Sequence, residues 1–125
     1  MTDTPLLASS RALVEEVWCN SDKWVANLAK AEGLLRGALD ANPNEPLTLT
    51  CLGAVLCDQG RHSSAVSPLK LAVERGSTDR HTFFNLGVAL LSCGRHDEAS
   101  SYFEQARDMA ASPLSWEAYF DAQAH

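Results

Sequence analysis

A repeat with a period of 34 residues constrains the fold of this chain more than any other feature of its sequence. Residues 46–79 align with residues 80–113, and residues 12–45 form a weaker copy of the same pattern. A fixed period of this length is typical of helical units that stack on one another and bury a continuous core. The two complete copies share these residues: Leu52-Gly53 and Leu86-Gly87, Gly60-Arg61-His62 and Gly94-Arg95-His96, Ala65 and Ala99, and Ala72 and Ala106. We therefore expect one repeat domain over residues 1–125.

Each complete copy contains two stretches in which apolar residues recur at helical spacing. In the second copy, Leu49, Leu52 and Leu56 follow the i, i+3, i+7 pattern of one helix face. Glycine adopts the left-handed backbone beyond a helix end, so Gly60 and its counterpart Gly94 predict a tight turn before the next helix. Each copy is therefore expected to be a helix-turn-helix unit.

Proline and polar residues indicate where the helices begin and end. Asn44 and Ser112 are each followed closely by proline, and both resemble helix starts. Pro68 lies inside a predicted helix, where it removes a backbone donor and favours a kink. In the weaker first copy, the pattern predicts helices near residues 6–20 and 22–41.

Small residues recur at three positions of each complete copy, between bulky neighbours. Two helix backbones approach each other closely only where the side chains are small, so these positions predict tight helix crossings. They are Gly53, Ala65 and Ala72 in one copy, and Gly87, Ala99 and Ala106 in the next. The arrangement resembles the tetratricopeptide repeat, a helix-turn-helix unit of the same length. The resemblance is partial in the first copy, where Trp18 and Cys19 stand in place of leucine and glycine.

This resemblance implies an all-α fold: an α-α superhelix, or helix-turn-helix solenoid, of three tetratricopeptide-like repeats with a C-terminal capping helix. Residues 1–11 are expected to form an N-terminal tail or the start of the first helix, and residues 112–125 the capping helix. Repeat arrays need such a cap because each unit leaves an apolar face for its neighbour. Two helices per repeat and the cap give about seven helices.

The charge balance excludes two classes of partner. The chain has 10 Lys and Arg residues against 16 Asp and Glu residues, a formal net charge of −6, and it lacks a basic stripe. Phosphate backbones and anionic lipid surfaces are bound mainly by clustered cations, so we expect neither nucleic acid nor membrane as a partner. The first residues lack the basic and apolar regions of a secretory signal, which predicts a cytoplasmic location.

No pattern of catalytic or metal-ligating residues stands out. The four histidines lie far apart in the sequence, and His62 and His96 are related by the repeat. The four cysteines form no C-x-x-C pair and are expected to be small, partly buried hydrophobes. Motifs of nucleophilic or phosphate-binding sites are also missing. We therefore predict a protein that is not an enzyme and has no cofactor or metal.

The resemblance also implies a concave surface, lined by the first helix of each repeat, that binds another protein. The predicted groove residues are Leu47, Thr50, Ala54, Cys57, His81, Phe84, Val88 and Leu91. Periodicity supports an apolar ligand independently, because the helix over residues 79–93 has two apolar faces and needs one of them to pack within its repeat. The other face must be covered by a partner, by the N-terminal tail around Leu6-Leu7, or by a second copy in a homodimer.

Three functions remain compatible with these features. The first is an adaptor or chaperone-like module that binds an apolar peptide or helix of another protein in its concave groove. The second is an assembly subunit of a homo- or hetero-oligomer whose apolar face is permanently buried. The third is a chaperone of the type III secretion kind, which also uses three such repeats. Some proteins of the family that this chain resembles hold the C-terminal carboxylate of a partner with Lys, Arg and Asn side chains. Such a clamp is not expected here, because Phe84, Val88 and other uncharged residues fill most of the equivalent positions.

Overall fold

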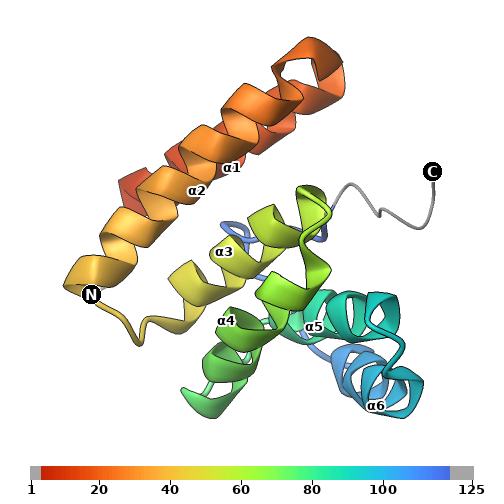
Figure 1. The fold of residues 1–125 in the computed structure, drawn as a ribbon. Helices are drawn as coiled ribbons and strands as arrows, with labels where there is room; N and C mark the ends of the chain where they lie inside the picture. Colours follow the sequence, from red (N-terminus) through yellow and green to blue (C-terminus); the bar gives the residue numbers. More distant parts are fainter. Residues whose placement is uncertain (1–3, 119–125) are drawn as a thin grey trace.

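The computed structural model describes residues 4–118, which form an all-α superhelix (Figure 1). Consecutive helices pack as pairs, α1 on α2, α3 on α4 and α5 on α6, and each pair also contacts the next. The elements in chain order are α1 (Thr4–Cys19), the short 3-10 helix η1 (Ser21–Lys23), α2 (Trp24–Ala41), α3 (Pro46–Asp58), α4 (His62–Glu74), α5 (Arg80–Ser92) and α6 (His96–Ala106). The predicted solenoid of helix pairs is confirmed.

Local chemistry accounts for several helix boundaries. Gly60 lies in the turn between α3 and α4, and Gly94 lies in the turn between α5 and α6. Their backbone φ angles are 75° and 79°, as their place in the repeat predicted. The N-cap of α3 is Glu45, whose side chain accepts a hydrogen bond from the backbone N–H of Leu47, so the predicted start at Asn44 is wrong by one residue. The helix α4 continues through Pro68 as one element.

The small residues of the repeat lie where the paired helices cross, as predicted. A side chain added at Gly53 of α3 would collide with the branched end of Leu69 on α4. At Gly87 of α5 the same addition would approach the ring of Phe103 on α6 to 2.7 Å. The helices of the second and third pairs therefore approach as closely as glycine allows.

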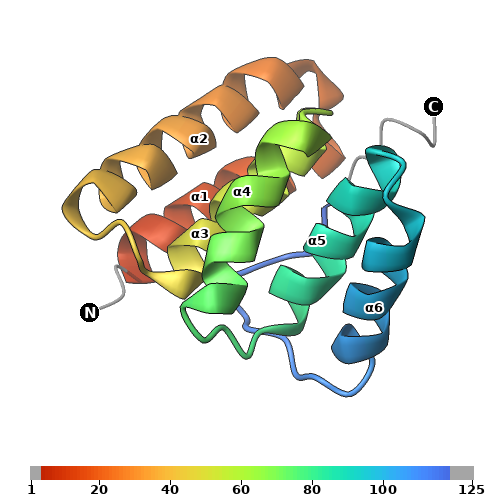
Figure 2. The ribbon, with the colours of Figure 1, turned by 60° about the horizontal axis from the view of Figure 1, so that its bottom comes forward.

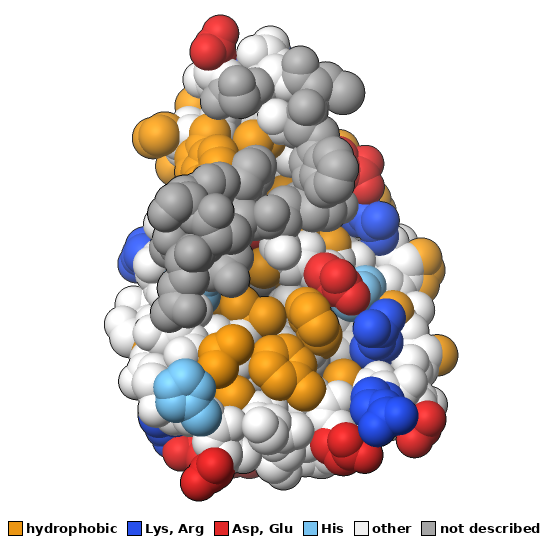
Figure 3. All heavy atoms as spheres, turned by 90° about the vertical axis from the view of Figure 1, so that its right-hand side faces the viewer, with side chains coloured by type: hydrophobic (Ala, Val, Ile, Leu, Met, Phe, Trp, Pro, Cys, Tyr) orange, Lys and Arg blue, Asp and Glu red, His pale blue; other side chains and the backbone are white. Residues whose placement is uncertain are grey.

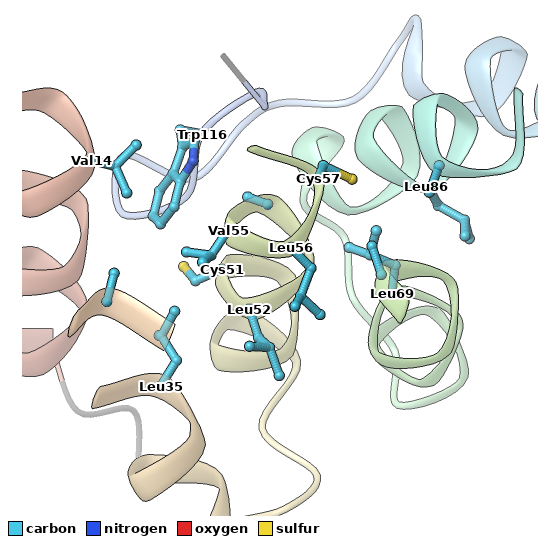
Figure 4. Packing of buried hydrophobic residues seen from close by; sticks show 14 of the residues in the cluster. Val14, Leu35, Cys51, Leu52, Val55, Leu56, Cys57, Leu69, Leu86 and Trp116 are labelled. Atoms are coloured by element: carbon cyan, nitrogen blue, oxygen red, sulfur yellow. The ribbon is translucent and has the colours of Figure 1, made fainter. Parts of the chain in front are cut away.

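The helix α3 lies at the centre of the core. Each of its residues from Thr48 to Asp58 is buried, because α2, α4 and α5 all contact this helix. Figure 4 shows Val55 of α3 directed towards α1 and Trp116, while Leu56 is directed towards α4. Leu7 is buried in the same core, and residues 6 and 7 belong to the helix α1 instead of a tail.

The predicted C-terminal capping helix is wrong over the described residues. Residues 112–118 are not helical; the chain turns back after α6 and runs behind α5 towards α3 (Figure 2). Ser112 therefore starts no helix, although its hydroxyl accepts a hydrogen bond from the backbone N–H of Leu114. The segment still covers the core, since Trp116 is only 2% exposed. Residues 119–125 of the predicted cap lie outside the described part of the chain.

An ionic cluster joins the first two repeats. The carboxylate of Glu32 on α2 accepts hydrogen bonds from Arg36 at 2.8 Å, from Arg61 at 3.0 Å and from Gln59 at 3.2 Å. Burial by itself raises the pKa of Glu32, but these donors outweigh burial and leave the pKa below its ordinary value. The cluster therefore stabilises the fold only while Glu32 is ionised.

Replacing Glu32 by glutamine is expected to lower the free energy of unfolding by about 0.5–1 kcal/mol at pH 7. Since the folded-state pKa lies below the ordinary value of 4.5, the difference from the wild type is complete above pH 4.5 and disappears as the pH falls through the folded pKa. Urea denaturation across this pH range measures the difference. The matched control is Glu104→Gln, because Glu104 forms an exposed pair with Arg107 and should show little effect. Equal losses in both variants at pH 7 would contradict the prediction.

Candidate protein-interaction surface

The predicted groove residues on α3 fill an interface between repeats. Thr50, Ala54 and Cys57 are completely buried. The Thr50 hydroxyl lies 2.5 Å from that of Thr82 on α5, and the Cys57 sulfur contacts the backbone oxygen of Asn85 at 4.0 Å. These three side chains therefore pack the second repeat on the third instead of lining an open groove.

Two other predicted groove residues are half-buried beside the C-terminal segment. Leu47 contributes to a hollow that is also lined by Ser112 and by the turn before α5. The Nδ1 atom of His81 lies 2.8 Å from the hydroxyl of Ser115. Burial lowers the pKa of His81 below its ordinary value, against the opposing effect of the nearby Asp79 carboxylate. His81 therefore serves here as a hydrogen-bonding partner of Ser115.

The remaining predicted residues, Phe84, Val88 and Leu91, lie on an apolar surface at the end of the stack. We call this surface the α5–α6 face and define it as these three residues together with Phe103 of α6. Phe84 packs edge-on against Phe103 at a centroid distance of 5.4 Å, and Leu91 is 38% exposed. Figure 3 shows apolar side chains gathered on one side of the molecule with charged residues around them. The hollow at this face is also lined by Arg80, Glu104 and Arg107. The face is apolar at its centre and charged at its margin.

The repeat itself shows what this face is shaped for. Phe84, Val88 and Leu91 stand 34 positions after Thr50, Ala54 and Cys57, which α5 covers completely. In the part of the chain that the structure describes, no helix follows α6 to cover the later set. The α5–α6 face is therefore the surface on which a further helix of the stack would pack.

The described side chains around Ser115 do not form an open catalytic or metal-binding site. The Ser115 hydroxyl, which is buried, donates a hydrogen bond to Asp79 and lies against His81, so the serine is held between these side chains and does not face an open site. Among the side chains that the structure describes, no group of three His, Cys, Asp or Glu residues has the geometry to hold a metal ion. None of the described helices is long and apolar enough to cross a bilayer.

The cysteines behave differently from one another. Cys51 and Cys57 are free and buried, as expected, and burial raises the pKa of the Cys51 thiol well above its ordinary value. Cys93 is also free but exposed, so the expectation of partial burial is wrong for this residue.

Sequence reasoning missed two residues that hold the C-terminal segment. Asn85 of α5 is completely buried, and its side chain bonds the backbone of Trp116 and Ala118. Arg11 of α1 bonds the carbonyl oxygens of Pro113 and Ser115. The sequence contained one usable signal, a lone amide between the apolar Phe84 and Leu86 on a helix for which two apolar faces were predicted.

Stacked helix pairs with a 34-residue period define a helical-repeat protein of the kind that binds other proteins. A family model for the tetratricopeptide repeat matches residues 85–111. Human tetratricopeptide repeat protein 7A is 35% identical over 86 residues, which make up 69% of this chain but only 10% of that relative. The chain belongs to the tetratricopeptide repeat family, whose members are generally non-enzymatic modules for protein–protein interaction.

Proposed function

We propose that this chain is an adaptor or chaperone-like module that binds an apolar helical segment of another protein over the α5–α6 face. The burial of Thr50, Ala54 and Cys57 under α5 carries the proposal, because the equivalent positions on α5 present larger apolar side chains without a covering helix among the described residues. An amphipathic helix of a partner would take the place that α5 takes in the preceding repeat. We expect this interaction to occur in the cytoplasm.

The size and chemistry of the α5–α6 face suit a moderate affinity. Burying one large apolar side chain completely contributes roughly 1.5–3 kcal/mol, and these side chains are already partly covered, so each contributes less. Association also costs several kcal/mol of translational and rotational entropy, so the few anchors of this face support about micromolar binding. The charged margin, with Arg80 and Arg107 beside Glu104, restricts which helices dock in the correct register.

Replacing Val88 by glutamate is expected to abolish partner capture while leaving the helical circular dichroism spectrum and the melting temperature nearly unchanged. A charge on a half-buried position of this face would be desolvated by a docked helix but remain hydrated in the free protein. Affinity capture from the source cell followed by quantitative mass spectrometry compares the variant with the wild type. The matched control is Val25→Glu, because Val25 is 80% exposed on α2.

Two results would contradict this assignment. If Val88→Glu unfolds the protein, the face belongs to the core; Leu91→Glu, at the more exposed position, then tests the face without that difficulty. If both variants fold and retain every partner of the wild type, the α5–α6 face is not the docking surface.

The second candidate is a subunit of an oligomer in which the same face is permanently buried. The exposure of Leu91 beside Phe84 and Val88 favours it equally, since a second copy would also cover these side chains. Sedimentation equilibrium separates the two candidates. A monomer at all concentrations favours the adaptor, whereas a dimer that Val88→Glu dissociates favours the subunit.

A further inference from the structure

Two arginines border the α5–α6 face where uncharged residues stand one repeat earlier. Arg80 and Arg107 line the hollow at this face beside Phe84. Thirty-four positions earlier the chain has Pro46 and Val73, which are both half-buried. The chain as a whole is acidic, with a formal net charge of −6, but the described lining of this hollow contains two arginines and one glutamate. The positive charge is therefore a local feature of this end of the stack.

Contacts within the described chain leave part of the hydrogen-bonding capacity of both arginines unused. The Nε atom of Arg80 is buried and has no hydrogen-bond partner among the described residues. Its Nη1 atom lies 3.7 Å from Oε1 of Glu117, which is longer than a hydrogen bond. The Nη1 atom of Arg107 lies 3.3 Å from Oε1 of Glu104, but these side chains are 71% and 74% exposed, so the pair contributes little. Both guanidinium groups therefore retain N–H donors for a carboxylate from outside.

The packing of the third repeat on the second indicates which part of a docked helix would meet these arginines. Thr50, the fifth residue of α3, is hydrogen-bonded to Thr82, the third residue of α5. Phe84 stands at the position of Thr50 one repeat later, and the guanidinium group of Arg80 lies 5.9 Å from its ring centre. A helix docked in the same way would therefore place its first turn beside Phe84 and Arg80. The positive N-terminal end of its dipole would then face two arginines, which is unfavourable unless that turn carries negative side chains.

We propose that the partner of the α5–α6 face is a helix of another protein whose first turn carries two or more Asp or Glu side chains, followed by large apolar residues. The carboxylates bind the guanidinium groups of Arg80 and Arg107, and the apolar residues cover Phe84, Val88 and Leu91. This inference rests on the docking function proposed above and adds to it the charge and the direction of the docked helix.

Three synthetic amphipathic helical peptides with the same length and the same apolar residues test the proposal. The first peptide carries two glutamates in its first turn, the second carries two glutamines there, and the third carries two glutamates in its last turn. Each peptide has a fluorophore on its polar side and is titrated with the full chain, with fluorescence anisotropy as the readout. The first peptide should bind about fivefold more tightly than either of the others. This advantage should shrink as the salt concentration is raised.

Variants of the chain show whether the arginines cause this preference. Arg80→Gln and Arg107→Gln should each reduce the advantage of the first peptide, and the double variant should abolish it. The matched control is Arg95→Gln, which changes the net charge equally and also breaks an exposed pair with a glutamate three residues away, Glu98. Arg95 lies at the opposite end of α6 and lines a different hollow, so this control should bind all three peptides as the wild type does.

The failure of this inference is distinguishable from the failure of the proposed function. If the three peptides bind equally and Leu91→Glu prevents the binding of each, apolar docking is supported and the acidic first turn is wrong. Equal binding of the first and third peptides would overturn the inferred direction, and equal losses in Arg95→Gln and Arg107→Gln would overturn the role of the face arginines. If no peptide binds the wild type, the docking function fails too, and a dimer in sedimentation would then assign the face to a second copy.

Discussion

Replacing Trp116 by alanine is expected to lower the free energy of unfolding by about 3–5 kcal/mol, the largest effect of any single change considered for this chain. The indole is 2% exposed and fills the space between α1 and α3, so its removal leaves a cavity in the core. The change also takes from the buried carboxylate of Asp58 the indole N–H that it binds. Urea denaturation followed by circular dichroism measures the loss.

The matched variant Trp116→Phe separates the cavity from the hydrogen bond. Phenylalanine keeps most of the packing volume but lacks the N–H group, so we expect a loss of about 1.5–3 kcal/mol, the cost of removing a hydrogen bond to a charged group. A loss below about 1 kcal/mol for Trp116→Ala would show that residues 112–118 contribute little to the core.

A single added methyl group at Gly53 is expected to destabilise the protein by about 1–3 kcal/mol. In the variant Gly53→Ala, the new Cβ atom collides with Leu69 close to its branch point, and Leu69 is completely buried. The helix propensity of alanine offsets part of the loss, by roughly 0.5–1 kcal/mol. Thermal or chemical denaturation of the variant and the wild type gives the difference.

Gly33→Ala is the matched control for this prediction. Gly33 lies in α2, and a Cβ atom added there meets nothing within 4 Å. The control should therefore be more stable than the wild type by roughly 0.5–1 kcal/mol. If both variants shift stability in the same direction, the close crossing of α3 and α4 does not limit the size of residue 53.

The features that repeat along the chain were predictable from the sequence. Gly60 recurs as Gly94, and Gly53 recurs as Gly87, with the same period of 34 residues. The first two shape the backbone of a turn, and the other two allow the paired helix to come close. Local chemistry of this kind is visible in spacing alone. It was sufficient to predict the helix pairs, their turns and their close crossings.

Long-range contacts account for the parts that were not predicted. The spacing of apolar residues after Ser112 is compatible with a helix, but Asp79, Asn85 and Arg11 supply hydrogen bonds that hold the segment in a non-helical form. Similarly, periodicity places Thr50 on one face of its helix but does not show which neighbour covers that face. Comparing Thr50 with the much larger Phe84 at the equivalent position was the signal that the two repeats have different surroundings.

The contact between Arg11 and Ser115 joins residues 104 positions apart in the chain. In a simple linear array each unit touches only its neighbours, so the terminal units open independently and the ends fray first. Here residues 112–118 are hydrogen-bonded to α1, α3 and α5, so neither end opens without breaking contacts of the other. The consequence is a cooperative array with a raised contact order, whose folding is complete only when residues 112–118 have returned to the first repeat.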